Sequence, residues 1–217
     1  MSASNRMISS DPRVGGGLQA LAARPTGAER ETSPPASPPI EGAARLSEAT
    51  RAGISLRVYG DLGEVEREWK AFERGADCTV FQTFDWLAKW QRHIGKRKDT
   101  IPAIVLGGNA EGHLLFILQL AIEARGPVRC LTWLGSELCD YNAPLLAEDF
   151  FTNLNSDRFV ALWGDIVRLL RSDPRFAFDF VDLRKMPETI GAQRNPFLDL
   201  PVLAHPSGAY VANLDGD

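Results

Sequence analysis

The sequence predicts an α+β fold in which helices flank a mainly antiparallel, twisted sheet. The first observation is a series of three apolar runs, separated by glycine-containing turns, as in a meander of hairpin-linked strands. The second is the order of elements: strand, two helices, three strands, helix, strand, short helix, strand. With 217 residues, 44% of them hydrophobic, the chain has the composition of a globular protein.

The first 53 residues are expected to form a disordered leader. They contain no Phe, Tyr or Trp, and they include a proline cluster at 33–39. A segment without large apolar side chains buries too little surface to offset its ordering entropy. Residues 54–217 are then expected to form one folded unit with its own core.

The folded part is expected to begin with a strand over residues 54–59, where apolar and polar residues alternate. Asp61 follows as a suitable N-cap for a helix over residues 62–76. The apolar residues of that helix recur at helical spacing and are expected to face the core: Leu62, Val65, Trp69 and Phe72.

A second helix is expected over residues 81–95, where aromatic and apolar residues again follow the helical period. Thr83 is the candidate N-cap, because its hydroxyl can accept a hydrogen bond from the first turn. Gly95 is suited to the position just after the last turn.

From residue 101 the pattern changes to short apolar runs bounded by turns, and these predict the meander: 101–108, 113–123 and 128–135. An amphipathic helix is expected over 159–171. Residues 176–184 alternate strongly and predict another strand. Residues 187–197 predict one helical turn and a loop, and residues 209–214 a last strand.

Composition excludes several classes of function. The net charge of −4 and the pI near 5.5 give no reason to expect nucleic acid as a partner. No apolar run has the length needed to span a bilayer, and the N-terminus has no apolar stretch of a secretory signal. Three cysteines without a CxxC spacing support neither a disulfide framework nor a metal site. A cytoplasmic setting without a metal is expected.

The loop after residue 135 concentrates polar groups, since it carries Glu137, Asp140, Tyr141 and Asn142 within six residues. Asp140, Tyr141 and Asn142 are therefore candidates for binding a hydroxylated acceptor, with Asp140 also a candidate base. The alternative is a turn in which Asp and Asn bond their own backbone and Tyr packs at the rim.

Trp86 and Trp90 stand one helical turn apart and are candidates for stacking on a sugar ring, although such a pair also fits a core aromatic stripe. Cys139 is a poor candidate nucleophile, because the adjacent carboxylate of Asp140 raises the pKa of its thiol. No catalytic residue is assigned from the sequence.

Two motifs resemble a known family. FQTFDWLAKW, at 81–90, resembles the F-Q-x-x-x-W-L-x-x-W entry helix of the CelD/BcsL-type proteins of bacterial cellulose biosynthesis. LTWLGSELCDYNAPLL, at 131–146, resembles their L-G-x-x-x-x-D-Y-x-x-P-L loop. These proteins belong to the FemAB-like branch of the GNAT superfamily, which carries two GNAT-like units in tandem, and the order of elements from residue 54 is similar to one such unit.

The resemblance implies transfer of an acyl group from acetyl-CoA, or another acyl-CoA, to an amine or hydroxyl acceptor such as a glycan. It also implies an association with the machinery of cellulose or other exopolysaccharide synthesis. In such a site the pantetheine arm pairs with a splayed strand, and the pyrophosphate lies on backbone N–H groups at a helix N-terminus.

The sequence departs from this pattern at the pyrophosphate loop. The nearest spelling, GAQRNP at 191–196, has no glycine where the phosphate needs close backbone approach. The chain is therefore expected to be the first, N-terminal unit, truncated before the acyl-CoA-binding unit. Two alternatives stay open: a non-catalytic scaffold or glycan- or partner-binding module, and a complete single-unit acetyltransferase with an unusual loop.

Overall fold

The computed structural model describes residues 46–50 and 53–204. Most of the expected leader and the expected strand at 209–214 lie outside these residues. One difference concerns the leader's end, because residues 46–49 form a strand that pairs with the strand at 55–59. That pairing rests on backbone hydrogen bonds, which do not require large apolar side chains.

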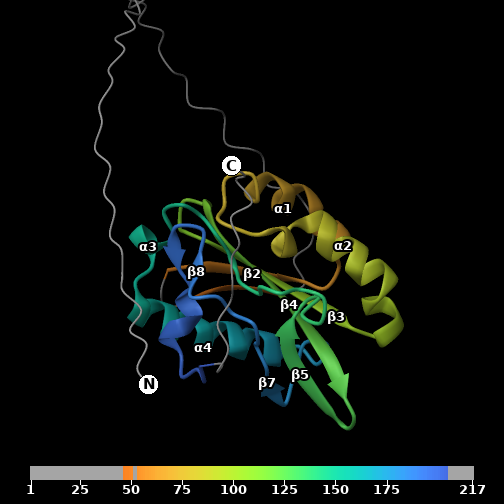
Figure 1. Cartoon of the computed structure of the whole chain (residues 1–217). Helices are drawn as coiled ribbons and strands as arrows, with labels where there is room; N and C mark the ends of the chain where they lie inside the picture. Colours follow the sequence, from red (N-terminus) through yellow and green to blue (C-terminus); the bar gives the residue numbers. More distant parts are fainter. Residues whose placement is uncertain (1–45, 51–52, 205–217) are drawn as a thin grey trace, which may run out of the picture. The chain divides into compact units, whose positions relative to one another are not determined.

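A seven-stranded sheet forms the centre of the fold (Figure 1). Its strands are β1 (Leu46–Ala49), β2 (Ser55–Tyr59), β3 (Ile101–Gly108), β4 (Leu114–Arg125), β5 (Val128–Trp133), β6 (Leu145–Leu146) and β7 (Phe180–Val181). The order is β1-β2-β3-β4-β5-β7, with β6 pairing β4 beyond the end of β5. Every pair is antiparallel except β5–β7. The predicted α+β class with a mainly antiparallel sheet and a β3–β4–β5 meander is confirmed.

Helices cover both faces of the sheet (Figure 1). On one face lie the 3-10 helices η1 (Leu62–Glu64), η2 (Val80–Gln82) and η3 (Gly95–Lys98) with helices α1 (Glu66–Phe72) and α2 (Phe84–His93). On the other lie α3 (Phe150–Asn153) and α4 (Ser156–Ser172). Since both faces are covered, β4 is buried along most of its length and its sequence is almost continuously apolar.

The two faces bury separate apolar clusters. Side chains of α1 and α2, including Trp69 and Leu87, pack with Ile117 and Ala121 of β4. On the opposite face the side chains of α4 pack with a second set of strand residues, among them Leu118, Leu120 and Ile122. Alternate residues of β4 therefore serve different cores, as the pleat of a strand requires.

The first expected helix, 62–76, is shorter in the structure. It consists of η1 followed by α1, which ends at Phe72. Asp61 caps it as predicted, since its Oδ1 accepts a hydrogen bond from the backbone N–H of Gly63 at 2.8 Å. Residues 73–76 instead form a turn that leads toward η2.

The second expected helix, 81–95, contains η2 and α2 with a break at Thr83. Thr83 occupies the N-cap position, but its hydroxyl donates to the carbonyl of Val80 at 2.7 Å. The cap oxygen comes from Glu73, whose Oε2 accepts from the backbone N–H of Phe84 at 2.8 Å. After the helix, the left-handed residue is Asp99 (φ 53°) and not Gly95, which begins η3.

The strand expected over 176–184 is reduced to the two residues of β7. Phe176 and Ala177 are in a turn, with both backbone N–H groups donating to the carbonyl of Asp173 at 2.9 Å. Phe176 and Phe178 are buried in the core that α4 covers. Their alternation therefore reflects packing against a helix, not sheet pairing.

Residues 187–197 differ from the predicted helical turn and loop. They contain a small hairpin of β8 (Thr189–Ile190) and β9 (Gln193–Arg194), whose turn has Gly191 in the left-handed region (φ 56°). The helical turn follows as η4 (Pro196–Asp199). Its Phe197 packs edge-on against Trp133 with ring centroids 5.2 Å apart, which anchors the segment to the sheet.

None of the helices in the described part of the chain has both the length and the apolar character needed to cross a bilayer.

Candidate functional site

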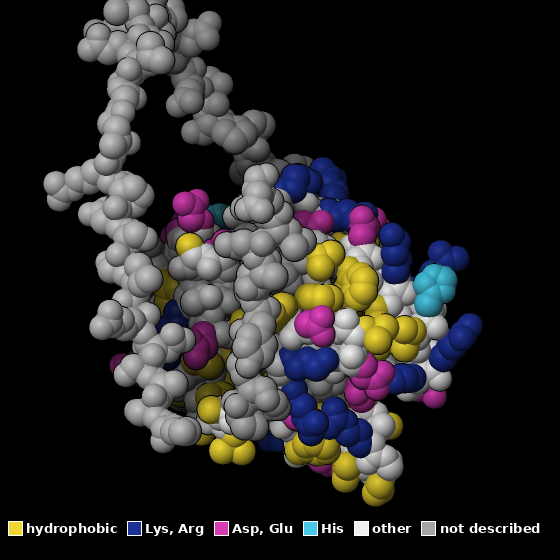
Figure 2. Space-filling model, viewed as in Figure 1, with side chains coloured by type: hydrophobic (Ala, Val, Ile, Leu, Met, Phe, Trp, Pro, Cys, Tyr) yellow, Lys and Arg dark blue, Asp and Glu magenta, His cyan; other side chains and the backbone are white. Residues whose placement is uncertain are grey.

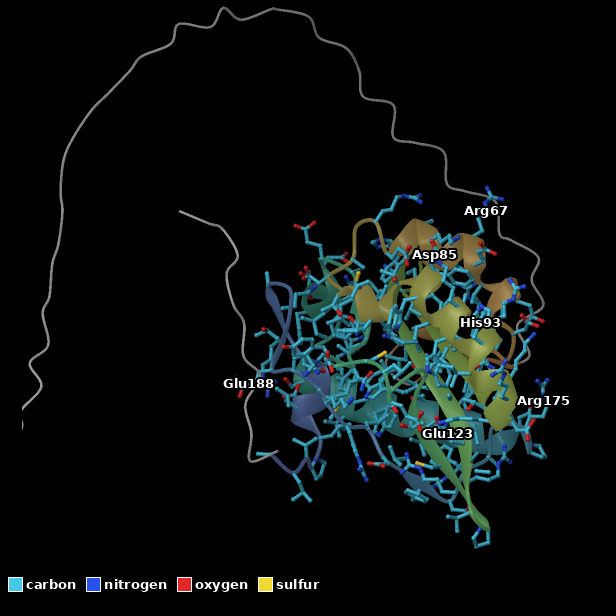
Figure 3. All side chains as sticks on the ribbon, turned by 45° about the vertical axis from the view of Figure 1, so that its right-hand side comes forward. Arg67, Asp85, His93, Glu123, Arg175 and Glu188 are labelled. Carbon is cyan, nitrogen blue, oxygen red and sulfur yellow. The ribbon has the colours of Figure 1, made fainter. Side chains whose placement is uncertain are left out.

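A charged cleft lies where the sheet extends beyond α2. Its volume is about 590 Å³, and β4, β5, η3, the loop after β5 and the segment after β7 line it. The charged side chains of the lining are Lys98, Glu123, Arg125, Glu137, Asp182, Arg184 and Lys185. Figure 1 shows the β4–β5 hairpin projecting past the helices, and Figure 3 shows Glu123 at that end of the sheet, opposite Asp85 at the start of α2.

The position of Glu123 follows from the alternation of β4. Ile117 and Ala121 point toward α1 and α2, and Glu123 and Arg125 continue the same row. Beyond the helix end this row has no helical residues above it, so it lines the cleft. The covalent geometry of one strand thus places a carboxylate and a guanidinium next to each other in an open part of the sheet.

Glu123 is the most distinctive group in the cleft. Its side chain is 17% exposed, and its nearest cation, the Arg125 guanidinium, is 3.9 Å away. Within residues 46–50 and 53–204 its carboxylate accepts no hydrogen bond. Burial raises the pKa of Glu123, and Arg125 opposes this only in part. A carboxylate with a raised pKa and no hydrogen-bond donor of its own has the properties of a general base.

Arg125 is held by Asp182, which also receives a hydrogen bond from Arg184 Nε at 2.8 Å. Burial alone would raise the pKa of Asp182, but the hydrogen bonds from Arg184 and Arg125 outweigh burial and lower it. On the opposite wall Lys98 forms an ion pair with Glu137. Asp182 and Glu137 therefore each have a cationic partner in direct contact, whereas Glu123 lies 3.9 Å from the guanidinium of Arg125.

The loop of residues 135–142 contributes Ser136 and Glu137 to the lining of the cleft, and it is fastened at several points. Lys185, in the left-handed region at φ 58°, donates from Nζ to the carbonyl of Cys139 at 3.0 Å and of Ser136 at 3.3 Å. The backbone N–H of Asn142 donates to the carbonyl of Lys185 at 2.9 Å. From the other side, Gln82 Nε2 donates to the carbonyl of Tyr141 at 2.6 Å.

The structure brings four of the five predicted site residues together. Tyr141 and Trp86 both pack against Phe81, at centroid distances of 6.3 and 5.7 Å. Asp140 is exposed beside Tyr141. Asn142 is only 3% exposed, and its side chain donates to the carbonyl of Arg184 at 3.0 Å, so it is occupied in holding the loop.

Trp90 lies apart from this group. It is 4% exposed, and it packs in the core beneath Gly135 together with Leu87. The core-stripe alternative therefore describes Trp90, whose ring is not accessible to a sugar. Trp86 is partly exposed and keeps part of its ring at the surface.

Cys139 is also buried, at 1% exposure. Burial raises the pKa of the Cys139 thiol, while Trp86 and Lys185 oppose that rise. A thiol with a raised pKa is a weak nucleophile at neutral pH. This agrees with the prediction that Cys139 is a poor nucleophile.

Apart from Glu137, the charged residues of the cleft were not singled out from the sequence, although the position of Glu123 is unusual there. It is an ionisable residue within the apolar run 114–124, and a carboxylate in a buried strand needs an explanation. Thr100 left no such signal. It lines the cleft at 4% exposure, and its hydroxyl has no hydrogen-bond partner in the described part of the chain.

Residues 191–196, the nearest spelling of a phosphate loop, have structural roles. Gly191 turns the hairpin against Asp77, and Asn195 Oδ1 accepts from the backbone N–H of Phe197 at 3.1 Å to cap η4. Among the described residues there is also no cluster of His, Cys, Asp or Glu that can hold a metal ion.

Comparison of the chain with protein-family models, with curated proteins and with solved structures finds no match.

Proposed function

We propose that this unit takes part in acyl transfer from a thioester such as acetyl-CoA to an amine or hydroxyl acceptor that binds in the charged cleft. Glu123 is the general base. The observation that carries the proposal is its carboxylate, which lies in an accessible cleft with a raised pKa and no hydrogen bond from the described residues. By resemblance, the process served is the synthesis of cellulose or another exopolysaccharide, in association with that machinery.

The position of the cleft in the sheet supports the same function. β5 and β7 are parallel and pair over only two residue pairs, Cys130–Phe180 and Leu131–Val181. The cleft is lined by Thr132 and Asp182, the residues that follow these pairs. The pairing of β5 and β7 therefore ends beside the cleft, with the hydrogen bond from the backbone N–H of Asp182 to the carbonyl of Leu131. The family resemblance places the pantetheine arm on a strand that separates from its neighbour.

The reaction needs one proton acceptor and no covalent enzyme intermediate. Glu123 accepts the proton of the acceptor hydroxyl or amine as its oxygen or nitrogen attacks the thioester carbonyl. The carbon–sulfur bond then breaks, and the thiolate leaves and takes up a proton. Glu123 returns its proton to solvent. The raised pKa of Glu123 brings its proton affinity nearer to that required at neutral pH.

The test is release of free thiol from acetyl-CoA in the presence of hydroxyl and amine acceptors. Glu123→Gln is expected to lower the rate by about 100-fold or more, because it removes the base without removing volume. Glu111→Gln, at an exposed position in the β3–β4 turn, is the matched control and is expected to keep the full rate. Full activity of Glu123→Gln would remove Glu123 from the reaction.

A non-catalytic module that binds a glycan or a partner is the second candidate. The observation that favours it is the use of residues 191–196 within the β8–β9 hairpin and the cap of η4, where the backbone N–H of Asn195 donates to the carbonyl of Glu188 and Pro196 has no N–H. Calorimetry separates the two functions. A module of this kind binds the acceptor but not acetyl-CoA, whereas the acyltransferase binds both.

A further inference from the structure

From the charges of the cleft we infer that its ligand is an electrically neutral, polyhydroxylated molecule, so that the acceptor group is a hydroxyl and not an amine. This inference rests on the proposed function for the acyl step, but it concerns binding and stands without the donor. It narrows the acceptor to a neutral glycan or polyol.

The first step is the number of charges. Four basic and three acidic side chains line the cleft. Figure 2 shows basic and acidic side chains next to one another over much of the face in view. Four basic against three acidic groups leave an excess of one positive charge, so the net attraction for a ligand of either charge is small.

The second step is the pairing of these charges. Asp182 binds Arg125 and Arg184, and Glu137 binds Lys98. A cationic or anionic ligand would have to displace one of these partners, at the cost of leaving a half-buried charge unpaired. Hydrogen bonding by a neutral hydroxyl requires no such exchange.

The third step is the remaining hydrogen-bonding capacity. The Glu123 carboxylate is an acceptor without a donor from the described residues, while Lys185 is occupied by two backbone carbonyls. An O–H group complements Glu123 directly. An ammonium group would also bind Glu123 but would face Lys98, Arg125 and Lys185, and an anionic ligand would face Glu123 itself.

Three matched ligands test the inference: methyl β-glucoside, the methyl glycoside of glucosamine, and methyl β-glucuronide. They share one ring and differ by a single neutral, cationic or anionic group. Binding to the full chain is measured from amide chemical shifts in the absence of acetyl-CoA. The glucoside is expected to bind at least about fivefold more tightly than either charged analogue, since one unfavourable unit charge costs about 1 kcal/mol at 4 Å in water.

Two further measurements sharpen the test. Raising the salt concentration is expected to change the affinity for the glucoside by less than about twofold, because a neutral ligand makes no screened ion pair. The largest shifts are expected at Thr100, Glu123 and Thr132. Glu123→Gln is expected to weaken glucoside binding, and Glu111→Gln to leave it unchanged.

Tighter binding of the amine or the uronide, or no shift with the glucoside, would overturn the inference. The acyl step has its own readout, since an ester product is cleaved by hydroxylamine and an amide is not. Amide formation on glucosamine would overturn the inference and leave the proposed acyl transfer in place. Glucoside binding without thiol release would support the inference about the ligand and contradict the proposed acyl transfer.

Discussion

Asn142 donates a hydrogen bond from its side-chain amide to the carbonyl oxygen of Arg184, at 3.0 Å and 42 residues away in sequence. Its backbone N–H binds the next carbonyl, that of Lys185. Asn142→Ala is expected to destabilise the protein by about 1–3 kcal/mol, because it leaves a carbonyl in a partly buried site without its donor. Chemical denaturation measures the loss. Asp140→Ala, at the exposed neighbouring position, is the control and is expected to change stability by about 0.5 kcal/mol or less.

Glu123 makes stability depend on pH in a defined direction. Its folded-state pKa is raised by burial, so the native state holds the proton to higher pH than the unfolded chain. Stability is therefore lost as the pH rises from the ordinary glutamate pKa through the raised value. Glu123→Gln does not ionise, and its advantage over the wild type is expected to grow from pH 4 to pH 7 in denaturation experiments. A constant difference across that range would show that burial does not perturb Glu123.

Glu73 and Thr83 offer a direct test of which side chain caps α2. Glu73→Ala is expected to cost about 1 kcal/mol, because the backbone N–H of Phe84 loses its acceptor. Thr83→Ala is expected to cost about 0.5 kcal/mol or less, since its hydroxyl makes only an exposed bond to the carbonyl of Val80. Thermal denaturation of both variants decides the matter, and a larger loss for Thr83→Ala would restore the sequence-based assignment.

Gly95 is required by packing and not by a left-handed backbone. A Cβ atom at this position would lie 2.7 Å from Cζ3 of Trp90 and would also overlap the Gln91 side chain. Gly95→Ala is therefore expected to destabilise the protein by about 1–3 kcal/mol. Gly75→Ala is the matched control, because no atom lies within 4 Å of a Cβ there. Equal stability of the two variants would contradict the packing explanation.

The meander and the helix at 156–172 could be predicted from the sequence because their apolar patterns coincide with their hydrogen bonding. The strand expected over 176–184 could not, since Phe176 and Phe178 alternate for reasons of core packing. The same limit applies to Thr83, which has the residue type of a cap while Glu73, ten positions earlier, supplies the oxygen.

The candidate site was predicted only in part. Ser136 and Glu137 of the loop after β5 line the cleft, but the candidates Asp140, Tyr141 and Asn142 are not among its lining residues. Asn142 holds the loop and Trp90 belongs to the core. The surroundings of Glu123 depend on other elements: α2 ends before it, and Asp182, which binds the neighbouring Arg125, follows β7 more than fifty residues later. The periodicity of one segment does not indicate which residues of other segments lie beside it.

The segment 182–185 contacts two walls of the cleft at once. Asp182 binds Arg125 on the sheet, and Lys185 binds the backbone of the 135–142 loop. A displacement of these four residues would release the guanidinium beside Glu123 and the loop in the same movement. The width of the cleft and the electrostatic surroundings that shift the pKa of Glu123 thus depend on the same four residues.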